Sequence, residues 1–181
     1  MKRLIIPLIL FLFLILEGVA LELLPATLVK GNLVIVPHWV LAFLVMMAIF
    51  YDREDTYMSI LYGLVFGLLI DVVYTGVLGV YMFTYALVIY IIHGLTKVLH
   101  ANIFGTIVLG LTGLVLAEAS INLIFSVVGL SEMEWGTYWL HRMLPTVLAN
   151  LLFMLLLYPF MKRWLVDWRD DSNLRSKSVY L

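Results

Sequence analysis

The sequence predicts an all-α polytopic membrane protein with six transmembrane helices. Three observations predict this class. The 181-residue chain is 64% hydrophobic and only 13% charged, and its mean hydropathy of +1.08 lies far above that of a soluble domain. Six apolar segments of about 20 residues, the length that crosses a bilayer, account for most of the chain. We therefore expect a transmembrane domain over residues 1–161 and a cytoplasmic tail over residues 162–181.

Polar or turn-forming segments separate the six spans, and tyrosines flank the charged turn at residues 52–55, as they do at membrane boundaries. We expect spans at about residues 4–24, 33–51, 57–74, 77–95, 103–130 and 143–161. The first span is longer than a signal-peptide core, so we expect it to be retained. The fifth is longer than a bilayer requires, so it must tilt, bend or leave the membrane at its end.

The polar tail begins with aromatic residues on one helical face. Trp164, Leu165 and Trp168 have the spacing of such a face. This pattern fits a short helix lying on the membrane surface, and it also fits ordinary anchoring of the last span. Beyond Asp170 the polar composition predicts disorder.

The positions of Lys and Arg predict the orientation. If the N-terminus is cytoplasmic, nine of the 11 basic residues lie on the cytoplasmic side: Lys2, Arg3, Arg53, Lys97, Lys162, Arg163, Arg169, Arg175 and Lys177. Only Lys30 and Arg142 lie on the other side. Basic residues collect in cytoplasmic loops, so we expect both termini in the cytoplasm.

Several function classes lack their characteristic residues. Without cysteine there is no disulfide, thiolate metal site or cysteine nucleophile. The four histidines lie in loops or near interfaces rather than at metal-ligand spacing, so we interpret His38, His93, His100 and His141 as interfacial residues. There is no phosphate-binding loop, and no basic stripe with interleaved aromatics that would indicate nucleic-acid binding. We expect no metal, no cofactor and no catalytic residue.

One stretch places small residues and an acid at helical spacing. Ser59, Gly63, Gly67 and Asp71 lie four apart and form one narrow stripe. Small residues allow the backbone of another helix to approach closely, so the stripe predicts a packing surface. An ionisable group in a membrane helix costs about 2.5 to 3.5 kcal/mol on insertion scales, which predicts that Asp71 points into protein. Alternatively, Asp71 caps a helix end near residues 75–76.

Three acids share one depth in the spans. Counted from the start of each span, Glu17, Asp71 and Glu118 lie about 20, 21 and 22 Å along their helices. Asn122 follows Glu118 by one turn, and Arg142 at the outer start of the sixth span is the available cation. We expect these five residues to form a buried polar cluster in the outer half of the membrane. Its role is either hydrogen bonding between helices or a small pocket that opens outward.

The six-span plan, the small size and the run at residues 67–81 resemble MreD, the family of bacterial rod shape-determining membrane proteins. The motif positions are Gly67, Asp71, Gly76, Gly79 and Tyr81. The resemblance implies a non-enzymatic scaffold in the bacterial cytoplasmic membrane that supports cell shape and lateral peptidoglycan synthesis. The implied partners are MreC, the MreB cytoskeleton, RodA and its class B penicillin-binding protein, all within the elongation complex.

The same family is similar to the substrate-binding component of energy-coupling-factor transporters. This likeness keeps a second function open, a membrane component that binds a vitamin or another small molecule. Such a component needs an outward-facing pocket, whereas a scaffold fills that space with side chains or a partner segment. An intramembrane enzyme is the weakest alternative. Depth rules out an aspartyl pair of Asp52 and Asp71, because they are expected about 20 Å apart and a catalytic pair must be nearly in contact.

Overall fold

The computed structural model describes residues 4–23, 33–53, 55–130 and 133–179, with side chains described as far as residue 170. Every regular element in these ranges is a helix, which confirms the all-α class. The elements are α1 (Ile5–Leu23), α3 (Trp39–Phe50), α4 (Met58–Ile70), the π-helical turn η2 (Asp71–Thr75), α5 (Val80–Leu95), α6 (Ile103–Val127), α7 (Trp135–Tyr138), the π-helical turn η3 (Trp139–Met143) and α8 (Leu144–Val179).

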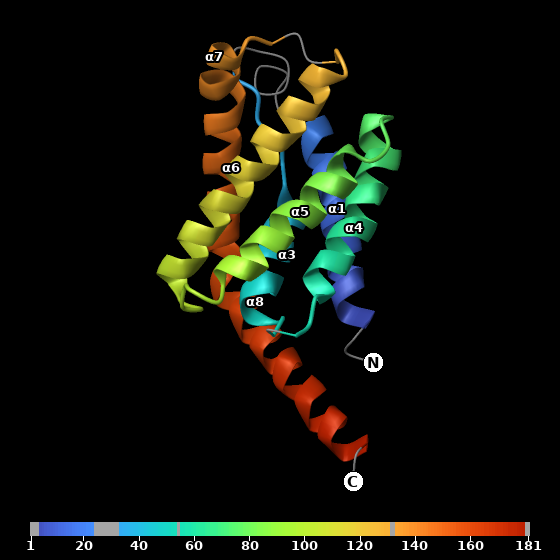
Figure 1. Ribbon diagram of the computed structural model, residues 1–181, viewed down its shortest axis with the longest axis vertical. Coiled ribbons are helices and arrows are strands. Elements are labelled where there is room, and N and C mark those ends of the chain that lie inside the picture. Colours follow the sequence, from blue (N-terminus) through green and yellow to red (C-terminus); the bar gives the residue numbers. More distant parts are fainter. Residues whose placement is uncertain (1–3, 24–32, 54, 131–132, 180–181) are drawn as a thin grey trace.

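The long helices alternate in direction. In Figure 1, α1, α4 and α6 run upward, α3, α5 and α8 run downward, and the first and last helices begin and end at the lower end. Four segments of the described chain are long and apolar enough to cross a membrane: Ile5–Leu23, Met58–Thr75, Ile103–Val127 and Trp135–Asp170. The helices α3 and α5 have only 12 and 16 residues. The count of six complete membrane spans therefore stays a prediction.

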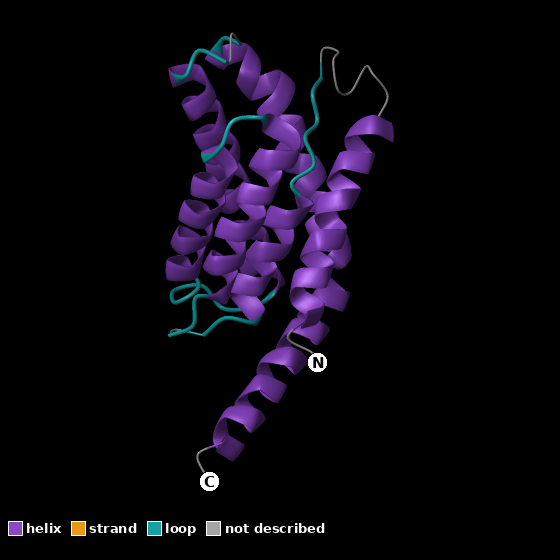
Figure 2. Cartoon of the chain, turned by 90° about the vertical axis from the view of Figure 1, so that its right-hand side faces the viewer, coloured by secondary structure: helices purple, strands orange, loops and turns teal. Residues whose placement is uncertain are grey.

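The second expected span is helical only in its second part. Residues 33–38 are not helical, and α3 begins at Trp39. Pro37 explains this start, because proline lacks an N–H and disfavours the helical conformation of the residue before it. Hydrogen bonds from Val34 and Val36 place the segment beside η3 and the start of α8. Figure 2 shows it as a loop. Its backbone is paired there, since Val36 accepts a hydrogen bond from Asn150 Nδ2 at 2.8 Å and donates one to Thr146 Oγ1 at 3.1 Å.

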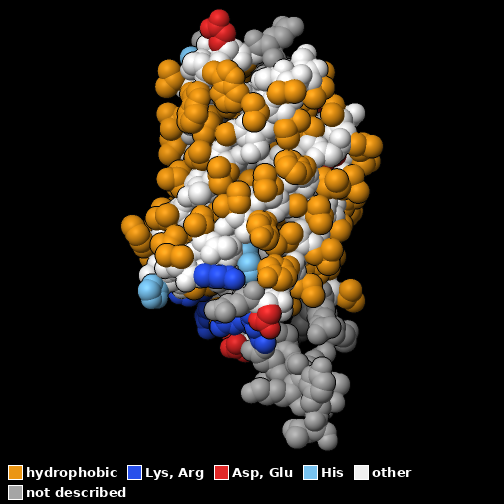
Figure 3. Space-filling view, viewed as in Figure 1, with side chains coloured by type: hydrophobic (Ala, Val, Ile, Leu, Met, Phe, Trp, Pro, Cys, Tyr) orange, Lys and Arg blue, Asp and Glu red, His pale blue; other side chains and the backbone are white. Residues whose placement is uncertain are grey.

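The central helix is α3, in which all eleven residues from Val40 to Phe50 are buried. The surrounding helices instead carry many exposed apolar residues, which cover the visible face of the bundle in Figure 3. A helix that is apolar on all sides is typical of the centre of a bundle. The outer helices therefore present their apolar faces outward, as expected for contact with lipid.

The predicted glycine stripe on α4 packs against α5 of the same chain. A Cβ added at Gly67 would lie 2.7 Å from Met82 Cα, and one added at Gly63 would lie 3.5 Å from the backbone of Tyr85. Between these helices the chain reverses through Gly76 and Gly79, with φ of 67° and 98°. Only glycine adopts such angles readily, so the turn depends on both. The small residues of the stripe therefore allow α4 and α5 to pack closely as a hairpin.

The last helix is longer than expected. α8 continues through Pro159 to Val179 and extends below the bundle in Figure 1, whereas a separate tail was expected from residue 162 and disorder beyond Asp170. Leu165 is buried, and the rings of Trp164 and Trp168 stack with centroids 6.2 Å apart. A helix lying on the membrane surface in this region stays a prediction.

Candidate functional site

A fully buried histidine joins four segments of the bundle. His38 precedes α3, and its Nε2 lies 2.7 Å from Glu118 Oε1 on α6. Its Nδ1 lies 2.9 Å from the Tyr85 hydroxyl on α5, and its backbone N–H donates to Asn150 Oδ1 on α8 at 2.6 Å. The interpretation of His38 as an interfacial residue was therefore wrong, because the loop at residues 33–38 carries it into the core.

Glu118 connects this histidine to α7 and η3, which precede α8. Its Oε2 accepts a hydrogen bond from the Tyr138 hydroxyl and lies 3.6 Å from Arg142 Nε. The Arg142 guanidinium also lies over the Tyr138 ring, 5.7 Å from its centroid, in a cation–π arrangement. Both carboxylate oxygens of Glu118 are thus engaged. Arg142 was expected only as the available cation of the polar cluster, and the partners His38 and Tyr138 of Glu118 were not expected.

Asp71 caps the following helix. Its buried carboxylate accepts hydrogen bonds from the backbone N–H groups of Gly79 at 2.9 Å, Tyr81 at 2.9 Å and Met82 at 3.1 Å. The first N–H groups of a helix have no partner within the helix, and the positive end of the helix dipole attracts a negative charge. Asp71 therefore caps the N-terminus of α5. The alternative prediction placed the capped helix end near residues 75–76, about four residues earlier in the chain than Gly79.

Glu17, on α1, caps the N-terminus of α3 in the same way. It is buried on α1, and its Oε1 accepts a hydrogen bond from the backbone N–H of Val40 at 2.8 Å. The two short helices α3 and α5 thus both begin inside the bundle with a carboxylate at their first turn. Unpaired N–H groups are costly away from water, so short helices at this depth require such caps.

Among the described contacts, the three acids of the expected polar cluster accept hydrogen bonds from different groups. Glu17, Asp71 and Glu118 all interact electrostatically with the buried Tyr85, yet each accepts hydrogen bonds from different groups. Asn122 is buried one turn beyond Glu118, and Arg142 pairs with Glu118 alone among the described ion pairs. Tyr81 and Tyr85, which bind Asp71 through a backbone N–H and His38 through a hydroxyl, pack on each other with ring centroids 5.6 Å apart. A single outward-opening polar pocket stays a prediction.

Sequence reasoning missed the neutral members of this network. Tyr85, Tyr138 and Asn150 are fully or almost fully buried and supply hydrogen bonds to His38 or Glu118. A signal was present, since each is a polar side chain in or beside an apolar span. Sequence spacing could not predict these pairs. His38 lies 47 residues from Tyr85 and 112 residues from Asn150 in the chain.

The network is suited to holding helices together. Among the described residues there is no group of three or more His, Cys, Asp or Glu that could hold a metal ion. Each acid of the network already accepts hydrogen bonds from protein groups. Fold and network together define an all-helical membrane protein whose buried carboxylates fix helix ends and helix faces.

Comparison with known proteins identifies the family within this class. A family model described as rod shape-determining protein MreD matches residues 2–166. The rod shape-determining protein MreD of Bacillus subtilis (strain 168) is 31% identical over 157 residues, which cover 87% of this chain and 90% of that protein. The chain belongs to the MreD family, a family of shape-determining membrane proteins, and membership supports a role in determining rod shape. No solved structure matches.

Proposed function

We propose that this protein is a non-enzymatic membrane scaffold of the bacterial elongation complex. It supports cell shape and lateral peptidoglycan synthesis through helix–helix contacts with MreC and other members of the complex, which include RodA, its class B penicillin-binding partner and the MreB cytoskeleton. The observation that carries this proposal is the use of every acid in the buried network. Glu17 and Asp71 hold helix N-termini, and Glu118 holds His38 and Tyr138.

This use of the acids favours a scaffold over an enzyme. A general acid or base must reach a substrate within hydrogen-bonding distance. Here the carboxylates are directed at backbone N–H groups and buried side chains of the same chain. These hydrogen bonds stabilise one arrangement of the helices, and a partner protein can recognise the surface of that arrangement.

The contacts with partners run through surfaces other than the glycine stripe. Gly63 and Gly67 face the backbone of α5, so they are already used within the chain. The outer helices leave large apolar side chains exposed, such as Leu148, Leu152 and Leu156 on one face of α8. Within lipid, helices associate through close packing and interhelical hydrogen bonds, and faces of this kind are where a partner helix packs.

The alternative function, a substrate-binding component for a small molecule, has less support. A groove of about 470 Å³ lies between α1, the loop at 33–38 and α8, at the end of the bundle where that alternative needs a ligand site. Its lining is apolar except for Asn150. An apolar groove suits a lipid chain or a helix better than a water-soluble vitamin.

We also propose a bacterial cytoplasmic-membrane location with both termini in the cytoplasm. Two observations support this orientation: α1 begins and α8 leaves the bundle at the same end, and Lys and Arg side chains gather at that end in Figure 3. Reporter fusions test it. External signals are expected after Asn32, Tyr74 and Glu134, and cytoplasmic signals after Asp55, His100 and Asp171. The reverse pattern, or an odd number of crossings, would contradict the orientation.

Deletion and partner capture in the source bacterium test the scaffold proposal. Loss of the protein should round or swell rod-shaped cells, and the wild-type chain should restore the shape. A tagged chain extracted in mild detergent should recover MreC. A defect in vitamin uptake with normal cell shape would instead favour the transporter alternative.

A further inference from the structure

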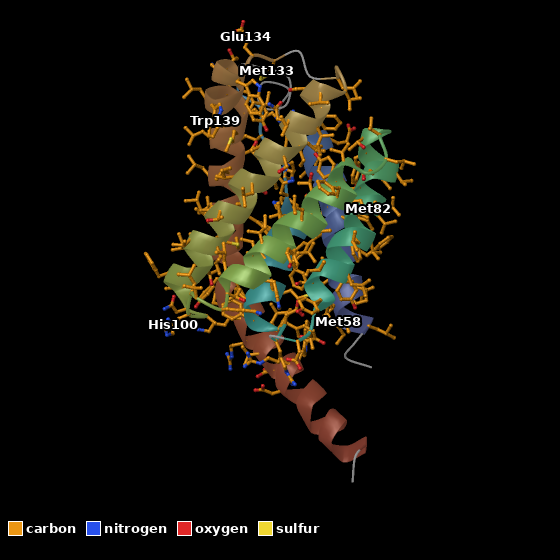
Figure 4. All side chains as sticks on the ribbon, in the orientation of Figure 1. Met58, Met82, His100, Met133, Glu134 and Trp139 are labelled. Carbon is orange, nitrogen blue, oxygen red and sulfur yellow. The ribbon has the colours of Figure 1, made fainter. Side chains whose placement is uncertain are left out.

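A second polar site lies at the opposite end of the bundle from the Glu118 network. It is a pocket of about 230 Å³ between the end of α3, the turn that follows it and the end of α5. Its lining residues are Ala48, Ile49, Asp52, Arg53, His93, Thr96 and Lys97. Met58 and His100 mark this lower end of the bundle in Figure 4, and Glu134 marks the other end.

Two buried side chains of this pocket have unused hydrogen-bonding atoms. Asp52 is 8% exposed, and its Oδ2 accepts from the backbone N–H of Ser59 at 3.0 Å and from its hydroxyl at 2.5 Å. Its Oδ1 has no partner in the described part of the chain. His93 is 4% exposed, its ring packs on Tyr57 with centroids 5.0 Å apart, and neither ring nitrogen has a partner among the described residues. Buried polar atoms nearly always have partners, so these point to a ligand.

The unused atoms define the chemistry of that ligand. Asp52 Oδ1 and one nitrogen of a neutral His93 are acceptors, and the other His93 nitrogen is a donor. The C-terminal ends of α3 and α5 meet at this pocket, and their dipoles favour a positive charge. Arg53 and Lys97 are exposed at the rim, where they attract a negative charge. The site therefore suits a cation with several N–H donors on its buried side and an anion on its outer side.

We propose that this pocket binds a lipid head group in which a primary ammonium is joined to a phosphate, as in phosphatidylethanolamine. The ammonium donates to Asp52 Oδ1 and His93, and the phosphate accepts from Arg53 and Lys97. A lipid is favoured over a free phosphoammonium compound because apolar residues adjoin the rim. Leu95 is 36% exposed and Val98 79% exposed, on either side of Thr96 and Lys97, and acyl chains would lie against them.

Binding of defined lipids to the purified full-length protein tests this proposal. Short-chain phosphatidylethanolamine is expected to raise the unfolding temperature and to remain bound in native mass spectrometry. Phosphatidylcholine, whose ammonium has no N–H, and phosphatidylglycerol, which has no ammonium, are expected to bind more weakly. Equal binding of all three lipids would overturn the proposal. Phosphoethanolamine and inorganic phosphate serve as soluble probes, and tighter binding of either than of the lipid would overturn the assignment to a lipid.

Charge reversal at the rim tests the position of the site. Lys97→Glu is expected to weaken phosphatidylethanolamine binding about fivefold or more, the usual effect of one basic residue near a membrane surface. Arg163→Glu is the matched control, because Arg163 is exposed on α8 outside this pocket. Equal weakening by both variants would mean general surface attraction and would overturn the site.

A change inside the pocket tests the ammonium contact separately. Asp52→Asn keeps an acceptor for Ser59 and removes the negative charge, so it is expected to abolish the preference for phosphatidylethanolamine over phosphatidylcholine. Its unfolding temperature without lipid reports whether the variant folds, and if it does not, Lys97→Glu still decides the proposal. A folded Asp52→Asn protein with an unchanged lipid preference would overturn the ammonium contact.

Discussion

The two ends of the bundle differ in whether their buried polar side chains have hydrogen-bond partners. At the upper end in Figure 1, both carboxylate oxygens of Glu118 and both ring nitrogens of His38 have partners from other segments of the chain. At the other end, one oxygen of Asp52 and both ring nitrogens of His93 have none in the described chain. A complete network fixes the arrangement of helices, whereas an incomplete one is available to a ligand. Substitutions at the two ends should therefore have different consequences.

The largest effect is expected at the centre of the complete network. Glu118→Leu leaves the His38 ring, the Tyr138 hydroxyl and Arg142 without their acceptor. We expect a loss of about 3 to 5 kcal/mol, since each buried polar group left unpaired costs about 1 to 3 kcal/mol. The free energy of unfolding in detergent and the rescue of rod shape in a deletion strain both measure the loss. Glu118→Gln is the control, because its amide still supplies one acceptor oxygen. Equal stability of the two variants would show that the network does not hold the bundle.

A somewhat smaller effect is expected at the cap of α5. Asp71→Leu removes the acceptor for three backbone N–H groups, and we expect a loss of about 3 kcal/mol, since a single buried unpaired group costs about 1 to 3 kcal/mol. Asp71→Asn keeps one carbonyl oxygen and should be tolerated far better. Unfolding of the purified variants gives the comparison, and equal tolerance of both would remove the cap as an explanation for Asp71.

The region around Asp71 shows which features could be predicted from the sequence alone. The four-residue spacing of Ser59, Gly63, Gly67 and Asp71 predicted one helix face, and the structure places Gly67 against the backbone of α5. The family followed from the run at residues 67–81, and the comparisons confirm it. Periodicity was informative here because Gly63 and Gly67 lie on one helix and pack against the next helix in the chain.

The partners across the bundle could not be derived in this way. His38 follows Pro37 and precedes an apolar run, a pattern typical of an interface, yet the loop at 33–38 carries it into the core. Its bond to Glu118 spans 80 residues, and the bond from Val40 to Glu17 spans 23. Depth along the helices was calculable from the rise per residue, but rotation about each helix axis is set by tertiary packing.

A moderate effect is expected where α4 and α5 touch. Gly67→Ala places a methyl group 2.7 Å from the Met82 backbone, so the helices must separate, and overpacking of this kind costs about 2 kcal/mol. Gly94→Ala is the matched control on α5, because no heavy atom lies within 4 Å of its added Cβ. There alanine should be neutral or slightly stabilising, since it is the better helix former. Similar losses for both in thermal unfolding would mean that the stripe is not closely packed.

The smallest effect is expected at the incomplete end and appears as a pH dependence. Burial raises the pKa of Asp52 above its ordinary value of 3.8, although the hydrogen bonds from Ser59 oppose this change. The folded protein therefore holds this proton more tightly than the unfolded chain does. The resulting stabilisation is complete below the ordinary pKa and is lost as the pH rises through the raised pKa.

Asp52→Asn isolates this contribution, because asparagine does not titrate and its amide oxygen can still accept from Ser59. The measurement is the unfolding temperature of the two proteins in detergent from about pH 4 to about pH 7. The wild-type protein should lose stability relative to the variant as the pH rises across this window. A constant difference would mean that Asp52 does not change protonation on folding.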